Sequence, residues 1–144
     1  MIEVAAAGAR LLPLPAVVAA AEILSLHAPE TAETRHLIGA EQLHCCRRGV
    51  RILNVARGGI IDEAALVEGL RSGQVAGAAL DVFETAPPAG SPLLTLDSVI
   101  LTPHLGASTQ EAQEKVAVRI AEQIAAYLKD GLVANAVNME GIDP

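Results

Sequence analysis

The chain has 144 residues, of which 51% are hydrophobic, and its mean hydropathy is +0.40. Ten basic against seventeen acidic residues give a net charge of −7, which argues against a protein that binds the phosphate backbone of nucleic acids. Its two cysteines, Cys45 and Cys46, are adjacent, so the sequence excludes a disulfide framework and favours a reducing, cytoplasmic location.

Membrane proteins and metalloproteins are also disfavoured. The longest apolar stretch, residues 11–21, contains two prolines and is shorter than the roughly 20 residues that a membrane-spanning helix needs. No basic segment precedes an apolar stretch in the way that a secretory signal requires. His44 and the two cysteines adjoin one another without a second pair of ligands, so we predict no metal site.

Short apolar stretches alternate with helical patterns along the chain. Residues 1–12 are typical of the end of a helix followed by a short strand at residues 10–12. Further strands are predicted at residues 22–26, 51–55, 75–82 and 98–101. Helices are predicted at residues 15–21, 39–46, 63–72 and 106–130. We therefore predict an α/β fold, a partial Rossmann-type parallel sheet with flanking helices and a long C-terminal helix.

The ends of several helices carry their own signals. Asp62 is a candidate N-cap, because its carboxylate can accept a hydrogen bond from the first turn of the helix that follows. Gly49, Gly73 and Gly131 are candidate C-caps. Residues 83–95 contain three prolines and a glycine, and we predict a loop there.

Four of the predicted strands are followed closely by an ionisable residue, which is His27, Arg57, Asp81 or His104. The carboxyl ends of parallel strands lie along one edge of a sheet, so these side chains can line a single crevice. Each residue also has a simpler interpretation: a hydrogen-bonded loop histidine, a turn-capping aspartate or a surface arginine. The two glycines after Arg57 predict a sharp turn with positive φ.

The side chains at these strand ends suggest a chemistry. Arg57 offers a planar fork of donors that matches a carboxylate. His104 can exchange a proton near neutral pH, and Asp81 can accept a hydrogen bond from an amide. A carboxylate anchor beside a proton acceptor suits the oxidation of a 2-hydroxy acid, and the hydride would pass to a nicotinamide cofactor.

Five segments of the sequence resemble the D-isomer-specific 2-hydroxyacid dehydrogenases, in particular the phosphoglycerate-dehydrogenase branch of that family. The resemblance extends from about Gly8 to Asn138. The segments are Ser25–Pro29 (SLHAP), Thr34–Gly39 (TRHLIG), Asn54–Glu63 (NVARGGIIDE), Gly77–Phe83 (GAALDVF) and Leu101–Ala112 (LTPHLGASTQEA).

The resemblance implies roles for individual residues. Arg57 would hold the substrate carboxylate, His104 would be the catalytic acid and base, and Asp81 would contact the nicotinamide carboxamide. The residues implied to bind the cofactor are Ala28, Val55, Ala56, Arg57, Asp81, His104, Leu105, Gly106 and Ala107. The cofactor implied is NAD, and NADP stays open because no residue that would discriminate between them is recognised.

The chain departs from the family pattern in two respects. No G-x-G-x-x-G motif occurs, so the segment that approaches the cofactor pyrophosphate is not found. The family's carboxylate partner of the catalytic histidine falls at position 86, where this chain has Ala86, and Glu84 is a weak candidate substitute. We therefore expect residues 1–144 to form a partial dinucleotide-binding domain, with its second half at 1–103 and a long return helix and tail at 104–144.

The resemblance implies the NAD-binding portion of an oxidoreductase that acts on the CH–OH group of a small 2-hydroxy acid. The substrate implied is 3-phosphoglycerate, in L-serine biosynthesis, and we do not expect the chain to turn over substrate alone. The chain would form a homo-oligomer or pair with a full-length relative. The alternative is a catalytically inactive assembly or regulatory subunit that pairs with a complete dehydrogenase.

Overall fold

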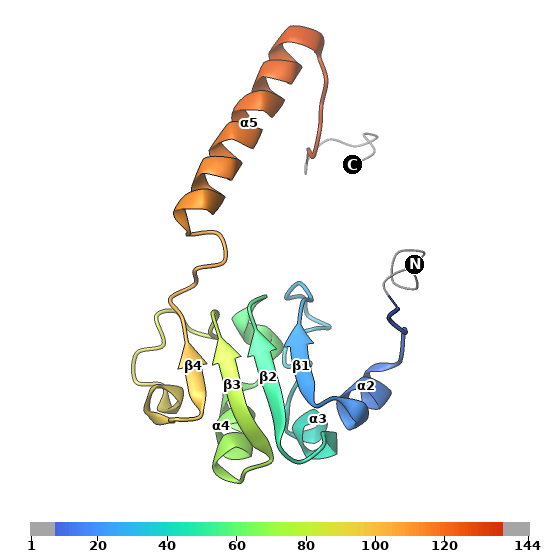
Figure 1. The fold of residues 1–144 in the computed structure, drawn as a ribbon, viewed down its shortest axis with the longest axis vertical. Helices are drawn as coiled ribbons and strands as arrows, with labels where there is room; N and C mark the ends of the chain where they lie inside the picture. The colour runs from blue at the N-terminus through green and yellow to red at the C-terminus, as the bar shows by residue number, and fades with distance from the viewer. Residues whose placement is uncertain (1–7, 137–144) are drawn as a thin grey trace. The chain divides into compact units, whose positions relative to one another are not determined.

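Four parallel strands form a single sheet in a computed structural model that describes residues 8–136 (Figure 1). The strands are β1 (Ile23–Leu26), β2 (Val50–Asn54), β3 (Val75–Leu80) and β4 (Val99–Leu101). Their order in the sheet is the same as their order in the chain, and every neighbouring pair is parallel. All four carboxyl ends therefore lie along one edge, as a crevice at that edge requires.

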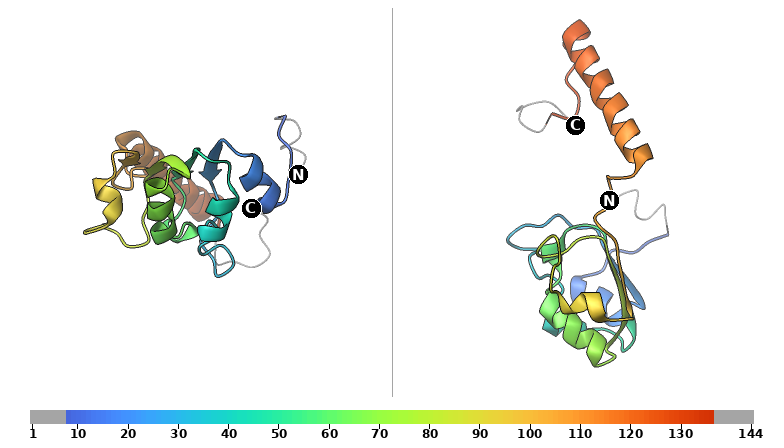
Figure 2. Two further views of the ribbon diagram at one scale, coloured as in Figure 1. Left: turned by 90° about the horizontal axis from the view of Figure 1, so that it is seen from below. Right: turned by 90° about the vertical axis from the view of Figure 1, so that its left-hand side faces the viewer.

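Helices and short 3₁₀ turns connect and follow these strands. They are α2 (Leu14–Ala20), α3 (Ala40–Cys45), η1 (Gly58–Ile60), α4 (Glu63–Arg71), η2 (Pro92–Thr95) and α5 (Gln110–Asp130). Helix α3 packs against α4, and α4 packs against β3. The right-hand view of Figure 2 shows the sheet from its edge, with the green helix α4 on one side of it.

The core lies between the sheet and the helices α2, α3 and α4. Side chains alternate along the strands, so that Leu24 and Leu26 of β1 are buried while Ile23 is 61% exposed. On β2, Ile52 is completely buried, and the register places it between Leu24 of β1 and Ala78 of β3. The helices contribute aliphatic side chains to the same cluster: Val18, Leu43, Leu66, Val67 and Leu70.

The opposite face of the sheet is more open within this part of the chain. Ile23 and Ile100 project from it with 61% and 69% of their surfaces exposed, and Leu53 is half-buried. Parallel sheets are usually covered on both faces, so this face has the composition of a surface that takes a covering layer.

The chain divides into two compact units between His104 and Leu105. The second unit contains α5, a helix of 21 residues in which no side chain is buried. Its apolar residues Val116, Ile120, Ile124 and Leu128 recur at every fourth position, as on one face of an amphipathic helix. Among the described residues, no helix is both long and apolar enough to cross a membrane.

Most of the predicted elements are confirmed, with boundaries that differ by a few residues. The Asp62 carboxylate accepts from the Ala65 N–H at 3.0 Å. Gly131 caps α5 with a φ of 67°, and Gly73, with a φ of 70°, directly follows the C-cap of α4. The C-cap predicted at Gly49 is wrong: α3 is capped by Cys46, and Gly49, with a φ of 83°, turns the chain into β2. Helix α5 begins later than predicted, because Thr109 rather than Gly106 provides the N-cap, accepting from the Ala112 N–H at 3.2 Å.

The strand predicted at residues 10–12 is wrong. Residues 9–13 have no regular secondary structure, and Leu11 is 68% exposed. Residues 10–12 have no neighbouring strand to pair with in the described part of the chain, and a short apolar segment without such a partner does not form a strand. The predicted helix end at residues 1–7 lies outside the described residues, and the two 3₁₀ turns were not predicted.

The two isoleucines at opposite faces of the sheet provide a matched test of this packing. Ile52→Ala leaves a cavity in the core and should lower the free energy of unfolding by about 2–5 kcal/mol. Ile100→Ala removes the same atoms from a side chain that is 69% exposed and should have a much smaller effect. Urea denaturation followed by circular dichroism measures both, and equal losses would contradict the assigned core.

Candidate functional site

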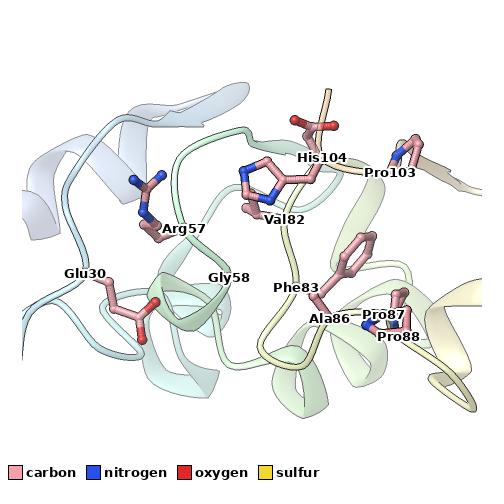
Figure 3. A pocket seen from close by; sticks show the side chains of 11 residues that line it. Glu30, Arg57, Gly58, Val82, Phe83, Ala86, Pro87, Pro88, Pro103 and His104 are labelled. Atoms are coloured by element: carbon pink, nitrogen blue, oxygen red, sulfur yellow. The ribbon is translucent and has the colours of Figure 1, made fainter. Parts of the chain in front are cut away.

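A pocket of about 530 Å³ lies at the carboxyl edge of the sheet (Figure 3). Pockets of this size are typical of small-molecule sites. Its walls come from the segments that follow all four strands. It is lined by Glu30, Arg57, Gly58, Asp81, Val82, Phe83, Ala86, Pro87, Pro88, Pro103 and His104.

A buried amide fixes the segment that carries Arg57. Asn54, at the end of β2, is 1% exposed, and its Nδ2 donates to the Arg57 carbonyl at 2.8 Å. Its Oδ1 accepts from the Ala56 N–H at 3.1 Å, so both polar atoms of the amide are used within one turn. The Arg57 side chain is exposed and donates from Nη1 to the Ala56 carbonyl at 2.6 Å. The turn therefore presents an arginine at the pocket from a rigid backbone.

The two glycines of η1 permit close contact rather than an unusual backbone angle. Neither is among the glycines with positive φ, so the expected reason for them is wrong. A Cβ at Gly58 would overlap the carbonyl of Phe83, and a Cβ at Gly59 would overlap the carboxylate of Glu30. The loop after β3 and the loop after β1 thus both rest directly on this turn.

Asp81 is a buried carboxylate at the pocket wall, with 6% of its surface exposed. Its N–H donates to the Asn54 carbonyl at 3.0 Å, which extends the pairing of β2 and β3 by one residue. Its Oδ1 accepts a hydrogen bond from the Thr102 hydroxyl, which follows β4. Asp81 is therefore held by both neighbouring strands.

His104 is the last residue of the first unit and lies three residues after the end of β4. Its φ angle is +61°, in the left-handed region that residues other than glycine seldom adopt. Such conformations are concentrated at functional sites. Figure 3 shows the His104 imidazole over the pocket, above Val82 and on the same side as the Arg57 guanidinium.

The structure brings Arg57, Asp81 and His104 together at one pocket. It does not bring the other predicted cofactor residues into the lining of that pocket. Ala28 is half-buried in the loop after β1 and packs against the core, while Val55 is 54% exposed and Ala56 is half-buried. The remaining predicted residues, Leu105, Gly106 and Ala107, belong to the second unit.

Position 86 and Glu84 have different surroundings. Ala86 lines the pocket with its methyl group, whereas Glu84 is not among the lining residues. The Glu84 carboxylate accepts from the Glu63 N–H at 2.9 Å and lies 3.1 Å from His36 Nε2. Glu84 is thus engaged at the start of α4 and at the loop after β1, rather than beside His104.

Glu30 is the polar lining residue that the sequence did not reveal. Its side chain contacts Arg35 and the N–H of Gly59. No local sequence pattern predicts these contacts. The only sequence signal is an acidic residue directly after Pro29, in the loop that follows β1.

The cysteines lie outside the pocket. Cys45 is exposed and Cys46 is buried. Burial, and to a smaller degree the neighbouring Cys45, raises the pKa of the Cys46 thiol, so this thiol stays protonated at neutral pH and packs as a core residue. Within residues 8–136, no group of three or more histidine, cysteine, aspartate or glutamate side chains is arranged to hold a metal ion.

Comparison with known proteins identifies the family. Residues 2–106 match the family model described as "D-isomer specific 2-hydroxyacid dehydrogenase, NAD binding domain". The chain belongs to this family.

It is 52% identical over 122 residues to the D-3-phosphoglycerate dehydrogenase of Methanocaldococcus jannaschii, and 50% identical over 123 residues to that of Bacillus subtilis. In both cases the match covers 85% of this chain and 23% of the relative. The chain therefore spans about a quarter of the length of these relatives.

Solved structures of similar proteins share the fold. A glyoxylate reductase from Paecilomyes thermophila matches with a TM-score of 0.84 and 35% identity, over 92% of this chain and 40% of that one. A D-isomer specific 2-hydroxyacid dehydrogenase from Xanthobacter autotrophicus Py2, in complex with NADPH and MES, matches with a TM-score of 0.74 and 44% identity. That match covers 87% of this chain and 51% of the other. The predicted family resemblance and the Rossmann-type fold are confirmed.

The close contact at Gly58 gives a direct test of the site's geometry. In Gly58→Ala the new methyl group overlaps backbone atoms of Phe83, which cannot rotate away. The substitution should therefore lower the free energy of unfolding by about 3 kcal/mol. Gly39→Ala is the matched control, because its Cβ would have ordinary contacts of 3.5 and 3.6 Å. Urea denaturation compares the two variants, and a Gly58→Ala chain as stable as Gly39→Ala would show that the loops do not meet there.

Proposed function

We propose that this chain supplies the nicotinamide half of the NAD site in a D-3-phosphoglycerate dehydrogenase-like oxidoreductase. The observation that supports this most strongly is the convergence of Arg57, Asp81 and His104 on one pocket at the carboxyl edge of a parallel sheet. The family description names an NAD-binding domain, and two relatives of about 50% identity are D-3-phosphoglycerate dehydrogenases.

Each of the three residues has a separate task in the proposed reaction. Arg57 binds the carboxylate of the 2-hydroxy acid through paired N–H donors and so orients the neighbouring CH–OH group. A ring nitrogen of His104 accepts the hydroxyl proton as the carbonyl forms. NAD, when bound, would supply the acceptor for the hydride that leaves the same carbon with its electron pair. The product is the corresponding 2-keto acid.

The described residues suit the nicotinamide end of the cofactor. The carboxylate of Asp81 can accept from the carboxamide N–H of the nicotinamide. The apolar side chains of Val82, Phe83 and Pro103 line the same pocket and would keep water from the ring. The sequence contains no G-x-G-x-x-G, so we assign no residue to the pyrophosphate. NAD is proposed from the family description, and the NADPH complex of the Xanthobacter autotrophicus protein keeps NADP open.

The wider assignment follows from the relatives. We propose 3-phosphoglycerate as the substrate, L-serine biosynthesis as the pathway and the cytoplasm as the location. Residues 1–144 would form part of a dinucleotide-binding domain, with a second-half unit at 1–103 and a return helix and tail at 104–144. The exposed apolar residues of α5 favour a homo-oligomer or pairing with a longer relative.

One observation favours the second candidate, an inactive assembly or regulatory subunit. The pocket contains Ala86 at the position where the family resemblance implies a carboxylate, and Glu84 is engaged elsewhere. The two candidates differ in whether the pocket supports catalysis once the rest of the domain is supplied.

A chimaera tests the proposed function. The aligned segment of the Bacillus subtilis enzyme, which is 50% identical over 123 residues, is replaced by this chain and assayed with 3-phosphoglycerate and NAD. Arg57→Gln in the chimaera should lower kcat/KM on the order of 10²-fold, because a charged donor pair worth several kcal/mol is lost. Arg47→Gln is the control, since it breaks an exposed 2.9 Å pair with Glu22 at the amino end of the strands. Equal effects of the two substitutions would contradict the assigned role of Arg57.

A second change in the chimaera separates the two candidate functions. Ala86→Glu places a carboxylate in the pocket that holds His104 and should raise kcat by about tenfold or more, because a positioned carboxylate assists the acid–base group. The same change at Ala89, which is outside the pocket lining, is the control. Turnover above background with Ala86 in place supports the enzyme, whereas turnover that appears only after Ala86→Glu supports the inactive subunit.

A further inference from the structure

Glu30 occupies an unfavourable place for a site that binds an anion. It lines the same pocket as Arg57, and its side chain is 34% exposed. A carboxylate of the protein is chemically equivalent to the carboxylate of a ligand and can form the same two-pronged pair with a guanidinium. If Glu30 paired with Arg57, it would compete with any carboxylate ligand.

Three contacts hold Glu30 away from Arg57. Arg35 Nη1 lies 3.2 Å from Glu30 Oε1, and the Gly59 N–H donates to Glu30 Oε2 at 3.2 Å. The carboxylate also rests on the Cα of Gly59, where any side chain would overlap it. Figure 3 shows the result: the Glu30 carboxylate is turned toward the Gly58 turn, while the Arg57 guanidinium points away from it.

Arg35 is itself held from a second side. Its Nη2 lies 3.6 Å from Glu84 Oε2, and the other oxygen of Glu84 accepts from the Glu63 N–H at 2.9 Å. The Glu63 carboxylate in turn accepts from the Glu84 N–H at 2.7 Å. Because Glu84 is tied to the start of α4 by this reciprocal pair, it forms a fixed anchor for Arg35.

The neighbouring residue fixes the backbone of the same loop. His36 has a φ angle of +52°, and its N–H donates to the Gly59 carbonyl at 2.7 Å. Its Nε2 lies 3.1 Å from Glu84 Oε2. The backbone at Arg35 is therefore fixed, and its guanidinium lies between the carboxylate of Glu30, which lines the pocket, and that of Glu84, which lies beside it.

We propose that Arg35 is a positioning residue that keeps Glu30 from pairing with Arg57. This inference rests on the proposed function, in which Arg57 binds the carboxylate of a 2-hydroxy acid. The Arg35 guanidinium satisfies Glu30 and leaves Arg57 available to the ligand. Without Arg35, Glu30 retains the Gly59 N–H, and its free oxygen turns to the arginine that shares its pocket.

The first experiment needs no ligand. In the 15N-labelled chain, the Nε–H signal of Arg57 is recorded for the parent, Arg35→Gln, Glu30→Gln and the double variant. We expect Arg35→Gln to shift this signal and to slow its exchange with water, and the added Glu30→Gln to restore the parent signal. Arg47→Gln should leave it unchanged. An Arg57 signal that is the same in the parent and in Arg35→Gln would overturn the proposal.

The second experiment measures binding of 3-phosphoglycerate to the same four chains by NMR titration. Arg35→Gln should weaken binding about tenfold or more, the effect of a competing ion pair, and Glu30→Gln in that background should recover most of the loss. A loss that Glu30→Gln does not recover would mean that Arg35 only stabilises the loop, which overturns the proposal. If 3-phosphoglycerate does not perturb Arg57 in the parent chain, the proposed substrate contact fails, and the first experiment still decides the role of Arg35.

Discussion

The contact between Gly58 and the backbone of Phe83 is the constraint on which the site depends. A side chain at position 58 would overlap the Phe83 carbonyl, so the turn after β2 and the loop after β3 meet with no side chain between them. This contact places Arg57 on one wall of the pocket and Val82, Phe83 and Ala86 on the other. Glycine is needed there because any Cβ would overlap Phe83, and not for its φ angle, which lies outside the left-handed region.

Each carboxylate in or beside the pocket has a partner within the protein. Asp81 is tied to the hydroxyl of Thr102, Glu84 to the start of α4, and Glu30 to Arg35 and Gly59. The ion pairs are partly exposed, and pairs of this kind contribute little to stability individually. They fix the direction of each carboxylate, and Figure 3 shows the Glu30 carboxylate turned toward the Gly58 turn and away from the Arg57 guanidinium.

Sequence reasoning succeeded where local patterns carry the information. Arg57, Asp81 and His104 were expected to share a crevice because each follows an apolar stretch and parallel strands end at one edge, and the three do line one pocket. It failed at residues 10–12, because a strand requires a partner that no local pattern reveals. The position of Glu30 was also out of reach, since it depends on Arg35 and on Gly59, 29 residues away along the chain. The left-handed conformation of His104 similarly arises from the tertiary fold.

We propose that the carboxyl-edge pocket recognises nicotinamide through this chain's own residues. The most direct test is an NMR titration of the 15N-labelled chain with reduced nicotinamide mononucleotide, with AMP as the comparison ligand. We expect saturable shifts at the backbone amides of Arg57, Val82 and His104 with the nicotinamide compound, and much smaller shifts with AMP. Equal shifts with both ligands, or shifts confined to the open sheet face around Ile23 and Ile100, would contradict it.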